Sequence, residues 1–183
     1  MTRHLTILIG FFLAVSAAAE EMPGTSQRAT CRIVGLFDAS READLRAAVE
    51  KVPGVTLTSL DFEHGEGDFS YDPSVAFKGT KPEQIIGKFD ELLRNASHHT
   101  LSIQPLLTTP HDKLISVEIK VIPLDCRACA LALHEILMKI EGVAQVIVVR
   151  AEGRVTALID PEKTNRAALE EALTKREIRL AAP

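Results

Sequence analysis

The feature that most constrains the fold of this chain is an internal repeat. Shifting the sequence by 88 residues places Gly54-Val55 on Gly142-Val143. The same shift places Asp72-Pro73 on Asp160-Pro161, and no gap is needed between the two landmarks. Apolar positions with helical spacing also coincide: Leu45, Val49 and Val52 in the first copy fall on Leu133, Leu137 and Ile140 in the second. The chain is therefore expected to hold two copies of one fold.

The hydrophobic periodicity predicts the same element order in both copies. In the second copy the expected elements are strand 114–122, a helix from Cys129 to Gly142, strands 143–149 and 155–159, helix 165–175 and strand 178–180. In the first copy strands are expected at 31–36, 55–62, 69–71 and 100–104, with a second helix introduced by a capping box at 80–83. This β-α-β-β-α-β order is the ferredoxin-like arrangement. The sequence thus predicts an α+β protein made of two tandem ferredoxin-like domains.

Two cysteines stand where the first strand of the second copy gives way to its first helix. Cys126 and Cys129 form a Cys-x-x-Cys pair, and the start of a helix favours thiolate over thiol through its free N–H groups and dipole. Thiolates bind soft metal ions, but the same pair can also close a disulfide. At this point metal binding, thiol–disulfide exchange and a purely structural disulfide all stay open.

Residues 113–180 resemble the heavy-metal-associated domain family, whose members include copper chaperones, the periplasmic mercury-binding protein and the N-terminal tails of metal-pumping P-type ATPases. The resemblance rests on the Cys126-x-x-Cys129 pair and its spacing to Gly142-Val143 and Asp160-Pro161. Pro123-Leu124 stands where the family usually has Gly-Met. A buried leucine is expected to anchor the loop in place of the methionine.

The resemblance implies that Cys126 and Cys129 hold one soft metal ion. Cu(I) is the expected ion, with Zn(II), Cd(II) or Hg(II) as alternatives. It also implies a carrier or chaperone that passes the ion to a metal-transporting or metal-accepting protein. No catalytic residue is expected, and the chain is not predicted to be an enzyme. The alternative is a periplasmic thiol–disulfide redox protein that uses the same cysteines.

Asp125 is the candidate third ligand. The Asp-Cys-x-x-Cys form is similar to the tails of zinc- and cadmium-exporting ATPases, and a carboxylate oxygen suits Zn(II) better than Cu(I). The competing interpretation is that Asp125 points to solvent or caps the helix.

Residues 28–107 are interpreted as a degenerate copy without the metal loop. Asp38 and Arg41 occupy the positions that match the two cysteines, and their charges are expected to pair with each other. This copy is predicted to bind no metal and to act as a partner or lid for the second. Arg127 in the metal loop, Lys175 and Arg176 are expected at the same end of the second copy as the thiols. They form either ordinary solvated surface or a basic rim that docks an acidic partner, for which the acidic first copy is a candidate. Cys31 is predicted to be a small buried hydrophobe.

The remaining segments set the expected location. Residues 1–19 read as a signal peptide ending in Ala17-x-Ala19, residues 20–27 as a tether, residues 108–112 as a linker and residues 113–183 as the metal-binding domain. The protein is expected to be exported, periplasmic or secreted, with no membrane span after cleavage. Its net charge of −4 argues against nucleic acid as a partner.

The other candidate residue types carry weaker signals. A thioredoxin-like oxidoreductase would be expected to carry a tryptophan before the cysteine pair, and the chain has none. His64, His98 and His99 are expected to be solvated, and His134 is expected to lie two helical turns away from the thiols.

Overall fold

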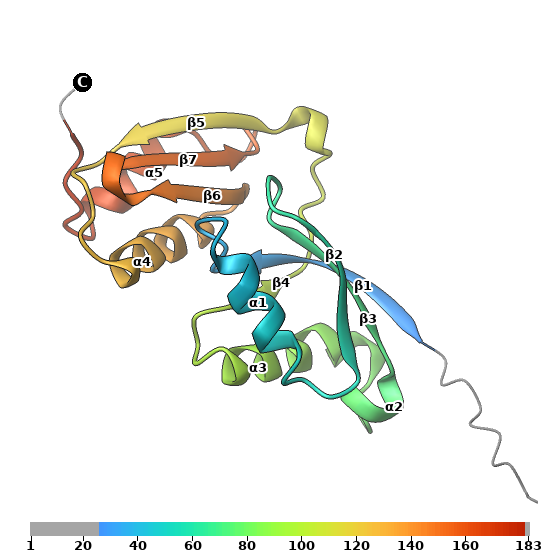
Figure 1. The fold of residues 1–183 in the computed structure, drawn as a ribbon. Coiled ribbons are helices and arrows are strands. Elements are labelled where there is room, and N and C mark those ends of the chain that lie inside the picture. The colour runs from blue at the N-terminus through green and yellow to red at the C-terminus, as the bar shows by residue number, and fades with distance from the viewer. Residues whose placement is uncertain (1–25, 182–183) are drawn as a thin grey trace, which may run out of the picture.

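The structure is a computed structural model that describes residues 26–181. The predicted signal peptide and most of the predicted tether lie outside these residues. The described chain forms two antiparallel sheets, each accompanied by helices (Figure 1).

The first domain contains the sheet with four strands. Its elements in chain order are β1 (Gln27–Val34), α1 (Arg41–Val49), β2 (Val55–Asp61), β3 (Glu66–Tyr71), α2 (Pro73–Ala76), α3 (Ile85–Ala96) and β4 (Ser102–Gln104). The strands pair in the order β2-β3-β1-β4. Leu45 of α1 and Phe89 of α3 are buried with Phe69 of β3 in one apolar core. Burying these helix faces against the sheet is what stabilises the domain.

The second domain repeats this plan. Its elements are β5 (Ile115–Lys120), α4 (Arg127–Met138), β6 (Val143–Val149), β7 (Arg154–Ile159) and α5 (Arg166–Thr174). The sheet order is β5-β7-β6, and an isolated bridge between Val121 and Leu180 continues it beyond β5. The strand expected at 178–180 is therefore reduced to this single bridge. Both sheet orders match the ferredoxin-like arrangement, so the predicted fold class is confirmed.

The structure explains why the two landmarks of the repeat keep one offset. The Asp72 N–H donates to the Gly54 carbonyl over 2.9 Å, and the Asp160 N–H donates to the Gly142 carbonyl over 2.7 Å. Both glycines have positive φ, +76° and +86°, which residues with a Cβ rarely adopt. Each glycine ends a helical segment and each aspartate follows a strand, so one hydrogen bond closes the same corner in both domains.

Two details at helix starts differ from expectation. The capping box at 80–83 does not form, because α3 is entered through a short 3₁₀ turn at Pro82–Gln84 and has no side-chain cap. The one-turn helix α2 was not expected from the sequence, and its start is capped by Asp72, which accepts from the Ser74 N–H. Among residues 26–181, no helix is both long and apolar enough to cross a bilayer.

Candidate metal site

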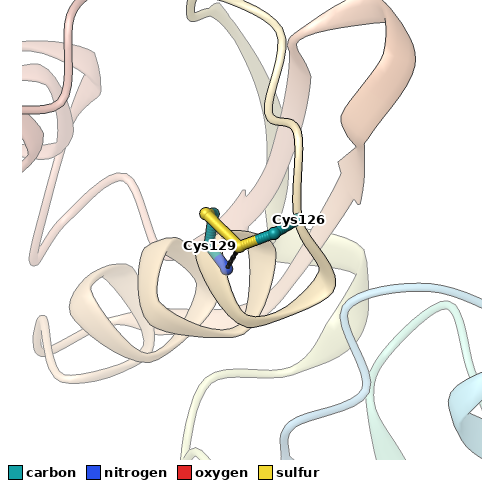
Figure 2. The surroundings of a disulfide bond; sticks show 2 residues. All are labelled: Cys126 and Cys129. Atoms are coloured by element: carbon teal, nitrogen blue, oxygen red, sulfur yellow. Dashed lines mark hydrogen bonds between the residues drawn. A yellow bond between two sulfur atoms is a disulfide. The ribbon is translucent and has the colours of Figure 1, made fainter.

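The two cysteines lie together at the exposed start of α4. Cys126 is the N-cap residue, and its Sγ accepts a hydrogen bond from the Cys129 N–H at 3.0 Å. The two sulfur atoms form a disulfide with an S–S distance of 2.28 Å and a Cα–Cα distance of 5.2 Å (Figure 2). Both residues are exposed. The helix start thus presents two adjacent sulfur atoms to solvent.

In the reduced state this arrangement suits a soft ion with few ligands. Two thiolates from neighbouring positions can hold Cu(I) or Hg(II) from opposite sides, and neither ion needs a full tetrahedral shell. Among residues 26–181, no group of three or more His, Cys, Asp or Glu side chains is placed to hold a metal ion. Asp125 is exposed, and its role as a third ligand stays a prediction.

The loop ahead of the cysteines is fixed to the body of the second domain. Leu124 packs against the apolar core of this domain, and its N–H donates to the Arg150 carbonyl over 3.1 Å. A leucine anchors the loop as expected, although Leu124 is half-buried and not fully buried. The cysteines therefore follow a loop whose backbone is already ordered. This order would reduce the conformational entropy lost on binding a metal ion.

The first domain contacts this loop from one side. Arg127, between the two cysteines, donates to the Asp44 carboxylate of α1 over 2.8 Å and to the Ser40 hydroxyl over 3.2 Å. The expected docking of a basic loop residue on the acidic first copy is therefore present. Because Cys126 and Cys129 stay exposed, the first domain flanks the loop without covering it.

The matching loop of the first domain is closed by an arginine. The expected pairing of Arg41 with Asp38 is wrong: Arg41 forms its ion pair with Asp44 at 2.5 Å. Its guanidinium also donates to the Gly35 carbonyl over 2.8 Å and to the Thr100 carbonyl over 2.9 Å. Burial lowers the pKa of Arg41 from its ordinary value. The Arg41 side chain, at the position that matches Cys129, thus ties together the backbone segments around this loop.

The loop after β1 also contacts the second domain. Phe37 is 1% exposed, and its side chain belongs to the apolar core of the second domain together with Val34 of β1. The Val148 N–H of β6 donates to the Phe37 carbonyl over 2.8 Å, which occupies part of the free edge of β6. The position of this loop beside β6 and α4 is visible in Figure 1. Sequence reasoning missed this contact.

His134 sits at the centre of the interface and is fully buried. Its Nε2 accepts from the Gly35 N–H over 2.8 Å, so its Nδ1 carries the proton and donates to the Val146 carbonyl over 2.8 Å. Burial lowers the pKa of His134 to about 4, and the positive charge of Arg41 contributes. This histidine joins α4 and β6 to the first domain, a role that the sequence did not indicate.

Two long polar side chains extend the contact along β6. Gln145 donates to the Phe62 carbonyl over 2.9 Å and to the Leu36 carbonyl over 3.3 Å. Arg32 of β1 donates to the Val143 carbonyl and to the Gln104 side chain. Buried polar groups that are paired in this way fix a specific geometry between the domains.

The buried imidazole predicts a stability that depends on pH. The unfolded chain takes up a proton at His134 below about pH 6.5, whereas the folded chain keeps the ring neutral down to about pH 4. The free energy of unfolding should therefore fall by roughly 3 kcal/mol as the pH decreases through this window. Urea unfolding of the parent and His134→Gln at pH 7 and pH 4.5 measures it. The variant should lose less between the two pH values, and the exposed-residue control His99→Gln should behave as the parent. Equal losses in parent and His134→Gln would contradict the assignment.

The other sequence candidates are placed as follows. Cys31 is completely buried, and burial raises the pKa of its thiol to about 11, so the expected inert role fits. His98 and His99 are exposed, as expected. The expectation that His64 is solvated is wrong, because its Nδ1 lies 2.7 Å from Asp61 Oδ2 and its ring stacks on that of His111.

Comparison with known proteins gives structural similarities only. No protein-family model matches the chain, and no curated protein matches it. The water-soluble region of the P-type ATPase CopA from Bacillus subtilis is 21% identical, covers 87% of this chain and 92% of its own, and has a TM-score of 0.34. Oxidized MerP from Ralstonia metallidurans CH34 is 24% identical over 37% of this chain and 94% of its own, with a TM-score of 0.35.

A third similar structure is the N-terminal domain of a potential copper-translocating P-type ATPase from Bacillus subtilis in the Cu(I)-loaded state. It is 33% identical over 37% of this chain and 84% of its own, with a TM-score of 0.35. The ferredoxin-like assignment of this chain rests on its own sheet orders.

Proposed function

We propose that the protein is an exported carrier of one soft metal ion, which it holds between Cys126 and Cys129 and passes to a metal-transporting or metal-accepting protein. The observation that carries the proposal is the exposed pair of sulfur atoms at the start of α4. Carriage involves no bond-making step, so the proposal includes no enzymatic activity.

The exposed position of the cysteines suits transfer between proteins. A partner that offers thiolates of its own can reach an ion held there without unfolding the loop. The signal peptide expected at residues 1–19 supports export, where the ion would be received and delivered outside the cytoplasm.

Anaerobic titration of the reduced protein with Cu(I), read by native mass spectrometry, tests the proposal. One equivalent should bind tightly, and the disulfide form should bind none. Tight binding by the oxidised protein would overturn the assignment of the ion to the two thiolates.

The disulfide between Cys126 and Cys129 favours a second candidate function, thiol–disulfide exchange. Reduction of insulin disulfides in the presence of dithiothreitol separates the two functions. A metal carrier should not accelerate this reaction above the rate with dithiothreitol alone.

Metal selectivity provides a prediction for Asp125. If the Asp125 carboxylate is a third ligand, Asp125→Ala should weaken Zn(II) binding at least about tenfold, the smaller of the losses in affinity that changes around a metal ion usually cause. The same change should leave Cu(I) binding nearly unchanged, because Cu(I) scarcely uses oxygen ligands. Competition titrations with a Zn(II) indicator and a Cu(I) chelator measure both affinities. Glu141→Ala, which changes an exposed carboxylate after α4, is the control. Equal changes for the two ions would show that Asp125 acts only through its charge or as an exposed surface residue.

The first domain fits the role of a permanent partner of the metal-binding domain. Arg41 closes the loop that matches the metal loop, and Asp38 and Arg41 supply no soft ligand there. The contact between Asp44 and Arg127 then positions one side of the metal loop.

A further inference from the structure

A positive charge lies inside the metal loop and is offset by a carboxylate of the other domain. Arg127 stands between Cys126 and Cys129, so the chain itself keeps its guanidinium in the vicinity of the two sulfur atoms. Its Nη2 donates to the Asp44 carboxylate of α1 over 2.8 Å and to the Ser40 hydroxyl over 3.2 Å. The charge next to the thiols is therefore under the influence of the first domain.

The Asp44 carboxylate is shared between two arginines. Its Oδ2 also accepts from Arg41 Nη1 at 2.5 Å. Burial lowers the pKa of Arg41, and the positive charge of Arg127 contributes, as expected for two guanidiniums that lie close together. The Arg41 side chain is 7% exposed, whereas those of Arg127 and Asp44 are 48% and 41% exposed. Arg127 is thus the member of this group that can move when the carboxylate is changed.

The two ions that a pair of thiolates holds best differ in the charge that they leave on the loop. Cu(I) with two thiolates carries one net negative charge, whereas Hg(II) with the same two thiolates is neutral. Both ions are soft and accept two ligands, so the coordination can be the same. A nearby positive charge therefore stabilises the Cu(I) complex and has much less effect on the Hg(II) complex.

We propose that Arg127 and Asp44 set the selectivity of the thiol pair between monovalent and divalent soft ions. Arg127 favours Cu(I), and Asp44 reduces this preference by holding the guanidinium toward α1 and offsetting its charge. Neither residue is a ligand; Asp44 is a positioning residue for Arg127. The inference rests on the proposed function, because it concerns an ion held by Cys126 and Cys129. It gives the first domain an electrostatic role at a site to which it supplies no ligand.

The two single variants are expected to act in opposite directions. Asp44→Asn removes the negative charge and frees Arg127, so the ratio of the Cu(I) affinity to the Hg(II) affinity should rise about two- to fivefold, the range that exposed charge pairs give. Arg127→Gln removes the positive charge, so the ratio should fall by a similar factor. The double variant should lie near the parent. If the contact were only structural, both single variants would break the same hydrogen bond and would change the binding of both ions in the same direction.

Anaerobic equilibrium dialysis of the reduced full chain, with dithiothreitol as the common competitor for Cu(I) and Hg(II), measures the ratio. Both ions displace the same two thiol protons, so a change in thiol acidity cancels between them. Sodium perchlorate at about 10 mM sets a Debye length of about 30 Å, which is longer than an arginine side chain. At about 1 M the Debye length falls to about 3 Å, and most of the difference between the variants should disappear.

Glu42→Gln is the matched control, because it removes an exposed carboxylate from the same helix that pairs with Arg46. It should change the ratio less than Asp44→Asn does. An unchanged ratio in Asp44→Asn, shifts of the same sign in both single variants, or a difference that persists at about 1 M salt would each overturn the inference and leave the carrier function intact. Failure of the parent to bind Cu(I) would instead overturn the proposed function, and the inference with it.

Discussion

The double substitution Cys126→Ser/Cys129→Ser is expected to lower the affinity for Cu(I) by far more than about 100-fold. A change in a residue that only orients a ligand already costs 10- to 100-fold in metal affinity. Here both proposed ligands are removed, and the hydroxyls that replace them are hard donors that Cu(I) scarcely uses. Each single substitution should also weaken binding severely, because one thiolate cannot hold the ion from two sides.

Anaerobic competition with a Cu(I) chelator measures this effect. Cys31→Ala is the matched control, since it removes a thiol that is completely buried in the first domain. It should retain the parent affinity even if the protein becomes less stable. A double variant that held Cu(I) as tightly as the parent would place the metal site elsewhere.

The second domain could be predicted from sequence in detail because its signals are local. β6 spans Val143–Val149, as the apolar run indicated, and α5 begins after Asn165, whose side chain accepts from the Ala168 N–H. Gly142 marks the end of a helical segment through its positive φ. Periodicity, an N-cap residue and a glycine each act within a few residues, so one sequence is enough to locate them.

The proximity of the two cysteines was predicted for a different reason. The approach of Cys126 and Cys129 follows from a spacing of three residues at a helix start, which needs no tertiary information. Predicting the ion-pair partner of Arg41, in contrast, requires tertiary information. Two acidic residues, Asp38 and Asp44, lie within reach along the chain, and only the folded loop decides that Arg41 binds Asp44.

The interface between the domains has almost no local pattern in the sequence that would predict it. In the sequence, His134 lies among apolar residues and cannot be told from an ordinary half-buried histidine. Its role is visible only in the folded protein, where the Gly35 N–H of the first domain donates to its ring. One signal could have been used: Leu36-Phe37 places two large apolar residues in a loop whose equivalent, Leu124-Asp125, has only one. A phenylalanine in an exposed loop of an isolated domain would be costly, and this excess predicts a partner surface.

Phe37→Ala is expected to destabilise the protein by about 3–5 kcal/mol and to loosen the two domains from each other. The ring is 1% exposed and packs in the core of the second domain, with its centroid 6.3 Å from that of the His134 ring and the two planes inclined by 60°. The guanidinium of Arg41 lies 5.6 Å from the ring centroid on the first-domain side. Truncation leaves a cavity between the domains and removes the side chain that holds the Phe37 carbonyl against β6.

Denaturant unfolding measures the loss of stability, and hydrogen exchange at the Gly35 and Val148 amides reports the interface, because these N–H groups donate across it. Leu169→Ala is the matched control: Leu169 is fully buried in α5, in the same core. Its loss should also destabilise the protein, by about 2–5 kcal/mol, without selectively exposing those two amides. If exchange at these two amides stayed as slow in Phe37→Ala as in the parent, the Phe37 side chain would not be needed to hold the two domains together. If exchange at both amides rises more than in the control, the loop after β1, which lacks the thiols, has the separate role of fastening the second domain to the first.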